Sequence, residues 1–142
     1  MVPVAGVRPD EVPDTFGDRR GLRRHRALDI PAPRGTAVVS ADDGLVIAVR
    51  QNRLGGRVVY AVDPDHRFVY YYAHLDSYRA GLSAGSTVAR GDVLGTVGST
   101  GNADGGAPHL HFQVMIHPSN GRWWDGDPID ARPYLVSPGR GR

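Results

Sequence analysis

Glycine and proline punctuate this chain so densely that long helices are excluded. The 142 residues include 19 glycines and 11 prolines. In a helix interior, glycine costs about 1 kcal/mol and proline about 3 kcal/mol relative to alanine. A composition of this kind favours a compact, tightly turned antiparallel sheet. Disorder is the competing interpretation, but regularly spaced apolar runs restrict it to the two ends of the chain.

Short β-branched and aromatic runs recur from Thr36 onward, separated by turn-forming residues such as Asp42-Asp43-Gly44. The predicted strands are residues 37–40, 44–50, 57–62, 68–74, 92–97 and 110–116. Residues 75–82 alone leave room for a short helical turn. We therefore predict an all-β fold, a compact antiparallel sheet resembling a barrel or sandwich, with long loops around a groove.

The length of the chain suits one domain with a core of its own. Residues 1–24 are rich in Pro, Asp, Arg and Gly and are predicted to form an irregular N-terminal arm. Residues 25–135 carry the motifs and strands of the domain. Residues 136–142 are predicted to be a flexible C-terminal tail.

Composition excludes several classes of chemistry. The chain has no cysteine, which removes thiolate metal sites, disulfides and cysteine nucleophiles. All 17 basic residues are Arg, and Glu11 is the single Glu, so no His-Glu-x-x-His helix exists. The net charge of +2 gives no indication of nucleic-acid binding. The cluster of Arg19, Arg20, Arg23, Arg24 and Arg26 is interpreted as a solvated loop, with contact to an anionic substrate or polymer as the alternative.

Targeting signals are also missing from the chain. No run approaches the roughly 20 apolar residues that a membrane helix needs, and residues 1–6 lack the features of a signal peptide. If the natural protein is exported, its export signal is absent from this chain.

Three short stretches supply the groups for a catalytic zinc site. Residues 25–29 contain His25 and Asp29, residues 72–75 contain His74, and residues 108–112 contain His109 and His111. Alternate residues of a strand share a face, so one histidine of the last pair can bind a metal while the other stands beside it. His25, Asp29 and His111 make three nitrogen or oxygen ligands and leave a fourth tetrahedral position open, as in catalytic zinc sites.

In this order, the motifs His-x-x-x-Asp, Tyr-x-His-Leu and Gly-Ser-Thr-Gly-Asn followed by Pro-His-Leu-His-Phe resemble the lysostaphin-like (LytM-type) zinc metallopeptidases, which cut peptidoglycan peptides. The resemblance extends from about Phe16 to Leu135 and implies one Zn²⁺ per chain. It implies His25, Asp29 and His111 as the zinc ligands. One departure is Ala27, where many members have Gly; activity should survive unless that position needs a positive φ.

The resemblance assigns His74 and His109 as an uncoordinated catalytic pair. Because no Glu is available, a neutral imidazole is the expected general base. His109, on the strand that carries His111, is the first candidate. His74 is expected to donate to the developing oxyanion or to share the role of base, and the sequence leaves these two duties open.

Other aromatic and polar residues are assigned by strand alternation. Tyr72 and Asn102 are predicted to border the substrate groove, with Tyr71 on the opposite face of the strand from Tyr72. Packing is the favoured interpretation of Trp123-Trp124, and an exposed binding patch is the alternative. His66 and His117 are interpreted as surface residues.

The leading hypothesis is a zinc metalloendopeptidase that hydrolyses peptide bonds in the stem or cross-link peptides of bacterial peptidoglycan. It predicts peptidoglycan peptides as partners, a monomeric state and a location in the cell envelope, periplasmic or secreted. The alternative is a non-catalytic LytM-type module that binds or activates another wall hydrolase. A cupin-like metal oxygenase also uses His-x-His on strands, but no Glu follows His111.

Overall fold

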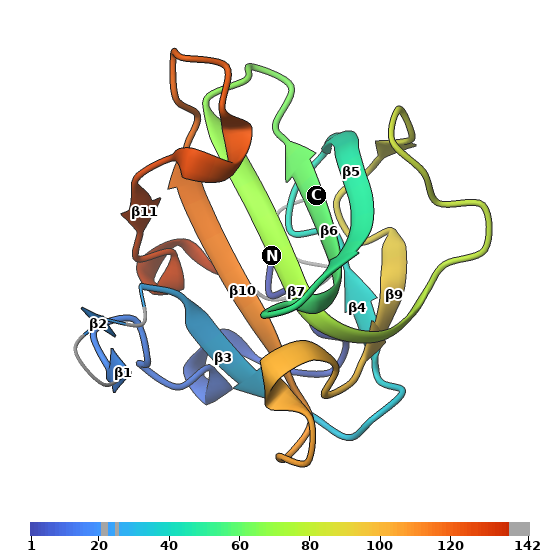
Figure 1. Cartoon of the computed structure of the whole chain (residues 1–142), viewed down its shortest axis with the longest axis vertical. Coiled ribbons are helices and arrows are strands. Elements are labelled where there is room, and N and C mark those ends of the chain that lie inside the picture. Colours follow the sequence, from blue (N-terminus) through green and yellow to red (C-terminus); the bar gives the residue numbers. More distant parts are fainter. Residues whose placement is uncertain (21–22, 25, 137–142) are drawn as a thin grey trace.

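The computed structural model describes residues 1–20, 23–24 and 26–136. Nine antiparallel strands form one open sheet with the order β11-β10-β7-β6-β5-β8, and β3, β4 and β9 pair beside this path (Figure 1). The bounds are β3 (Leu28–Pro31), β4 (Ala37–Val39), β5 (Gly44–Asn52), β6 (Gly56–Val62), β7 (Phe68–Tyr78), β8 (Thr87–Val88), β9 (Val93–Val97), β10 (His109–Ile116) and β11 (Pro128–Ile129). A separate pair consists of β1 (Arg19–Arg20) and β2 (Arg23–Arg24).

The helical content of the described residues is limited to four single-turn 3₁₀ segments, none long or apolar enough to cross a bilayer. They are η1 (Pro9–Glu11), η2 (Gly101–Ala103), η3 (Trp123–Asp125) and η4 (Arg132–Tyr134). The predicted all-β class and antiparallel pairing are confirmed. Residues 75–82 hold no helical turn, because β7 continues as a strand to Tyr78 and pairs there with β9.

Strand β10 lies between β7 on one edge and β3 and β11 on the other. Its residues alternate in burial, since Leu110 and Phe112 are fully buried while His109 and His111 are partly exposed. The buried face packs against the main core. The opposite face is therefore free to present polar side chains from the middle of the sheet.

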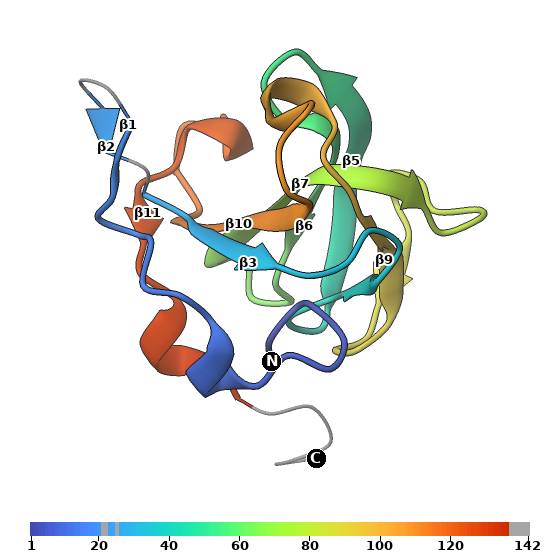
Figure 2. The same cartoon turned by 90° about the horizontal axis from the view of Figure 1, so that it is seen from below.

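The N-terminal segment packs on the core side of the sheet. Val2, Val4 and Val12 are at most 1% exposed, and Val4 forms an isolated β-bridge with Val38. Burying a valine contributes about 1.5–3 kcal/mol. Figure 2 shows this segment and η4 on one side of the sheet, with η2, η3 and the β5–β6 hairpin on the other. The residues predicted as an irregular arm thus supply part of the core.

Strand β7 contains a β-bulge at Ala73 and His74. Val59 of β6 pairs with Tyr72 and Arg57 pairs with Leu75, so two steps along β6 face three along β7. His74 has a left-handed φ of 64°, and its N–H donates to Gly55 O at 2.7 Å. An extra residue bends a strand and changes the side to which the following side chains point.

Candidate active site

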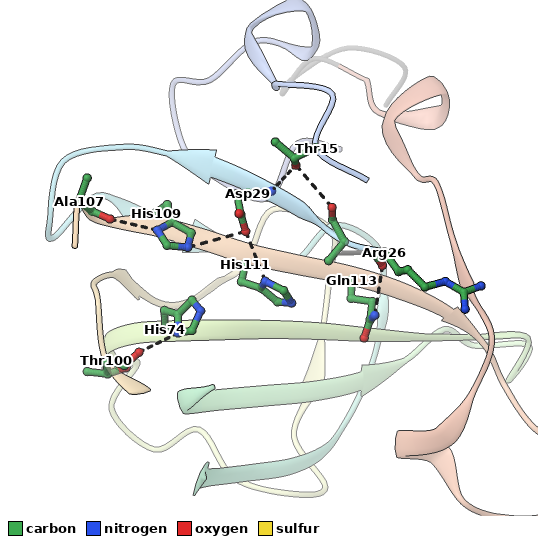
Figure 3. Close-up of polar contacts among 10 residues, drawn as sticks. Thr15, Arg26, Asp29, His74, Thr100, Ala107, His109, His111 and Gln113 are labelled. Carbon is green, nitrogen blue, oxygen red and sulfur yellow. Dashed lines mark hydrogen bonds and ion pairs between the residues drawn. The ribbon is translucent and has the colours of Figure 1, made fainter. Parts of the chain in front are cut away.

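Asp29 and His111 meet because β3 and β10 pair in register. The two residues are directly opposite each other, and His111 Nδ1 lies 3.3 Å from Asp29 Oδ1 (Figure 3). Two ligand atoms bound at about 2.0–2.1 Å to one tetrahedral ion are about 3.3–3.4 Å apart. The observed separation therefore fits two ligands of a shared zinc ion.

The backbone around Asp29 is fixed by side chains from outside the strand. Thr15 Oγ1 accepts a hydrogen bond from Asp29 N at 2.9 Å and donates to Ala27 O at 3.4 Å. Gln113 Nε2, on the groove face of β10, donates to Arg26 O at 3.1 Å. Arg26 has a φ of 57°, and Ala27 is not among the described residues with positive φ. The alanine at position 27 therefore fits its backbone conformation without strain.

The third predicted ligand, His25, lies outside the described residues. Within the part of the chain that the structure describes, no group of three His, Asp or Glu side chains gathers in a way that holds a metal ion. The assignment of His25 stays a prediction. Asp29 and His111 lie at a separation that suits two ligands of one ion.

His109 stands beside this pair on the same face of β10. Its Nε2 lies 3.7 Å from Asp29 Oδ1, and its Nδ1 lies 3.0 Å from Ala107 O. A carbonyl oxygen accepts hydrogen bonds only, so Nδ1 carries the proton and donates it to Ala107 O. In the neutral ring, Nε2 then presents a lone pair to the site.

His74 approaches the same place from β7. Its ring centroid lies 5.1 Å from that of His109 and 5.6 Å from that of His111. His74 Nδ1 donates to Thr100 O at 2.7 Å, which leaves Nε2 unprotonated in the neutral ring. The side chain is only 6% exposed, and this burial lowers the pKa of His74 to about 4. At neutral pH, His74 is therefore a neutral hydrogen-bond acceptor at Nε2.

A groove of about 790 Å³ contains Asp29, His74, His109 and His111. Its remaining lining consists of Leu54, Gly55, Tyr60, Tyr71, Ala73, Asn102, Ala103, Gln113 and Trp124. A second cavity of about 560 Å³ is lined by core and terminal residues and includes none of the predicted site residues. The groove on the polar face of β10 is thus the candidate active site.

The prediction that Tyr72 borders the groove is wrong. Tyr72 is fully buried in the core, and its hydroxyl accepts a hydrogen bond from Ala41 N at 3.0 Å. Alternation placed Tyr72 on the same side as His74, but the bulge between them moves His74 to the groove. Tyr71 faces away from Tyr72 as predicted, and it lines the groove instead.

Asn102 does line the groove, on the loop that contains η2. Trp123 packs against Tyr60, with ring centroids 4.6 Å apart, whereas Trp124 is 55% exposed at the edge of the groove. The two tryptophans therefore divide between the two interpretations that the sequence allowed. The ring centroids of His66 and His117 lie 6.2 Å apart, and neither residue lines the groove.

Sequence reasoning missed the roles of three residues, Tyr60, Tyr71 and Thr100. Tyr60 and Tyr71 pair across β6 and β7, with ring centroids 4.6 Å apart, and together form an aromatic part of the lining. Cross-strand pairing of two predicted strands was the available signal. Thr100 was recognised only as part of the Gly-Ser-Thr-Gly-Asn motif, although its carbonyl accepts the Nδ1–H of His74. That contact depends on tertiary structure and left no signal in the sequence.

Comparison with known proteins gives consistent matches. The sequence model described as Peptidase family M23 matches residues 23–130. An L-Ala–D-Glu endopeptidase of Bacillus subtilis (strain 168) is 37% identical over 123 residues, which make up 80% of this chain and 37% of that protein. Other curated relatives are named peptidoglycan DD-endopeptidases. The chain spans 37% and 21% of the lengths of the first two relatives.

Solved structures match over most of the chain. The catalytic domain of the antimicrobial peptidase lysostaphin from Staphylococcus simulans has a TM-score of 0.68 at 30% identity, covering 80% of this chain and 80% of that one. A zinc-containing peptidase from Vibrio cholerae has a TM-score of 0.68 at 28% identity, covering 85% of this chain and 35% of that one. Sequence and fold therefore point to the same group of proteins.

Proposed function

Because this chain belongs to peptidase family M23, we propose that it is a zinc-dependent endopeptidase that cuts the stem or cross-link peptides of bacterial peptidoglycan. The observation that carries the proposal is the 3.3 Å approach of His111 Nδ1 to Asp29 Oδ1, with two further imidazoles in the same groove. A carboxylate and imidazoles are suitable zinc ligands, and the extra imidazoles supply groups for proton transfer.

In this proposal His25, Asp29 and His111 hold one zinc ion. Bound there, the zinc would act as a Lewis acid that polarises a peptide carbonyl and lowers the pKa of water. Thr15 keeps Asp29 in place through the hydrogen bond to its backbone N–H. Antiparallel pairing of β3 with β10 keeps Asp29 opposite His111.

His109 is the proposed general base. Its Nε2 lone pair faces the site, and the Nδ1–H bond to Ala107 O holds the ring in that tautomer. After Nε2 takes a proton, the resulting imidazolium lies 3.7 Å from the carboxylate of Asp29. The same proton is then available for the leaving amine.

His74 shares the accepting role in this proposal. The neutral ring carries its proton on Nδ1, bound to Thr100 O, so Nε2 has no proton to donate to an oxyanion. Burial keeps the pKa of His74 near 4, which disfavours the cation that such donation would need. His74 Nε2 is therefore assigned to accept a hydrogen bond from the attacking water and orient it.

The groove, with Asn102 and Gly55 along its lining, suits an extended peptide that binds through backbone hydrogen bonds. In this proposal the protein acts as a monomer. A peptidoglycan substrate places the protein outside the cytoplasm, in the periplasm or secreted.

Digestion of purified peptidoglycan tests the proposal. The zinc-loaded protein is expected to release peptide fragments with new amino termini, identified by mass spectrometry, and a chelator is expected to stop their release. Fragments that instead show cleavage of the glycan or of the sugar–peptide amide would contradict endopeptidase activity.

The alternative is a non-catalytic wall module that binds or activates another hydrolase. It predicts binding to peptidoglycan without release of fragments, and increased release only when a second hydrolase is added. The presence of both His74 and His109 in the groove favours the catalytic function.

A further inference from the structure

The segment Gly98–Thr100 contacts both His109, the proposed general base, and His74, which is proposed to orient the attacking water. Gly98 O accepts the backbone N–H of His109 at 3.2 Å. Thr100 O accepts Nδ1–H of His74 at 2.7 Å. One three-residue segment therefore joins β7 and β10 at the site, although the two histidines lie 35 positions apart in the sequence.

The Thr100 side chain fixes this segment through two hydrogen bonds to the backbone. Its hydroxyl donates to Leu75 O at 2.8 Å and accepts the backbone N–H of Arg57 at 3.1 Å. Leu75 follows His74 directly and is fully buried. The hydroxyl thus ties the Thr100 backbone to β6 and β7 at the bulge that carries His74.

A second tether comes from the turn between β3 and β4. Arg34 Nη2 donates to Ser99 Oγ at 2.8 Å, and Arg34 Nη1 donates to Asp76 Oδ1 at 3.1 Å. Ser99 is 7% exposed, while the Arg34 side chain is 50% exposed. Exposed ion pairs contribute little to global stability. The effect of this tether is therefore expected on the position of the segment rather than on folding.

We propose that Thr100 is a positioning residue for His74, assisted by Arg34: its hydroxyl holds the carbonyl that keeps the proton on Nδ1 and the lone pair of Nε2 toward the groove. This inference rests on the proposed function for its catalytic consequence. Its structural half, the tautomer of His74, stands independently of any activity.

The Thr100 carbonyl can position His74 because it selects one of the two tautomers of the neutral imidazole. An imidazole without a fixed acceptor exchanges its proton between Nδ1 and Nε2, and only the Nδ1–H form presents an acceptor at Nε2. A displaced carbonyl also lets the ring rotate. Small misplacements of a catalytic group reduce turnover strongly, by up to about a hundredfold for 1 Å.

Two substitutions at position 100 separate the hydroxyl from the shape of the side chain. Thr100→Val keeps the branched shape and removes the hydroxyl, whereas Thr100→Ser keeps the hydroxyl and removes a methyl group. Thr36→Val is the matched control, because it makes the same replacement at an exposed hydroxyl. That hydroxyl donates to Pro33 O at 2.7 Å, within the turn between β3 and β4. Arg34→Met tests the second tether in a variant expected to fold.

Nitrogen-15 NMR of the imidazoles measures the tautomer, and steady-state kinetics on a soluble wall peptide measure kcat and KM. We expect the Nδ1–H form of His74 in the wild type, Thr36→Val and Thr100→Ser, and a mixture of tautomers in Thr100→Val. In Thr100→Val, kcat should fall about ten- to a hundredfold with KM and zinc content unchanged. Arg34→Met should show a smaller loss of kcat, about two- to fivefold, also without a change in KM.

Three results would overturn the inference: an unchanged His74 tautomer in Thr100→Val, an equal loss in Thr100→Ser, or a loss confined to KM. If Thr100→Val does not fold, an unchanged kcat in Arg34→Met overturns it. An inactive wild type would refute the proposed function, while the NMR comparison would still decide whether Thr100 positions His74.

Discussion

The two faces of strand β10 differ in chemistry although they alternate along the same eight residues. The groove face carries His109, His111 and Gln113, whose side chains contact Asp29 or the backbone at Arg26. The core face carries Leu110 and Phe112, which are at most 1% exposed. Polar side chains on the first face make specific contacts, and apolar ones on the second fill space.

Activity and stability should therefore depend on different residues of β10: activity on the odd-numbered residues of the groove face, and stability on the even-numbered residues of the core face. A change on the groove face should alter metal binding or turnover with little effect on the sheet. A change on the core face should lower the free energy of unfolding but leave the chemistry of the folded molecules intact.

Metal removal should have the largest effect and should act on the groove face alone. Dialysis against a chelator is expected to reduce peptide hydrolysis about a thousandfold or more, because several kcal/mol of transition-state stabilisation are lost. The far-UV circular dichroism spectrum should stay that of a β protein. Added zinc should restore activity, and a collapse of the spectrum after chelation would break the separation.

Leu110→Ala should act on the core face and should lower stability strongly. Removing this fully buried side chain between the two histidines is expected to lower the free energy of unfolding by about 2–5 kcal/mol in urea titrations. Turnover per folded molecule should be unchanged. Ile116→Ala on the same strand, at a residue 50% exposed, is the control and should cost less than about 0.5 kcal/mol.

Acid should destabilise the metal-free protein through His74. Its folded pKa of about 4 is below its usual value, so the unfolded chain takes up the proton first as the pH falls. Stability linked to His74 is therefore full above about pH 6.5 and is lost toward pH 4, by about 2 kcal/mol. Urea titrations at both pH values should show this loss in the wild type and in His66→Gln, but not in His74→Gln.

The lowered pKa of His74 also indicates which groups cause the fall in activity at acid pH. Because His74 stays neutral down to about pH 5, loss of turnover at an apparent pKa between about 5.5 and 7 should come from another imidazole or from protonation of the metal ligands. Zinc retained while activity falls identifies the proton-transfer histidine. An activity profile flat from about pH 5 to 8 on a soluble peptide, with chemistry rate-limiting, would contradict a histidine base.

Trp124→Ala should give the smallest effect and extends the comparison to a groove residue outside the sheet. This residue is 55% exposed and lines the groove from η3. Its loss is expected to raise KM about two- to tenfold through lost apolar contact with substrate, and to leave kcat unchanged. Tyr134→Ala, which removes an aromatic ring 76% exposed outside the groove, should change neither parameter.

The alternation of groove-facing and core-facing side chains along β10 was predictable from the sequence, because side chains of a strand point to opposite faces in turn. Strands β4, β5, β6, β7, β9 and β10 were predicted for the same reason, since each carries a β-branched or aromatic run between turns, whereas the four-residue β3 was not predicted. The short strands β8 and β11 have two residues each, too few for any period. The burial of Val2 and Val4 depends on long-range packing, which composition does not reveal.

The site was less predictable where the backbone departs from regular geometry. Tyr72 and His74 should share a face in a regular strand, but the bulge is fixed by the pairing of β7 with β6, and no local signal in the sequence marks it. The approach of Thr100 to His74 depends on the same tertiary arrangement. The assignment of His25 lies outside the described residues and stays a prediction.

The zinc content of His109→Ala and His111→Ala, measured side by side by elemental analysis, tests the division of labour on β10 most directly. We expect one zinc per chain in His109→Ala with turnover reduced about a hundredfold or more, and no bound zinc in His111→Ala. Full zinc occupancy in His111→Ala, or loss of zinc in His109→Ala, would contradict it.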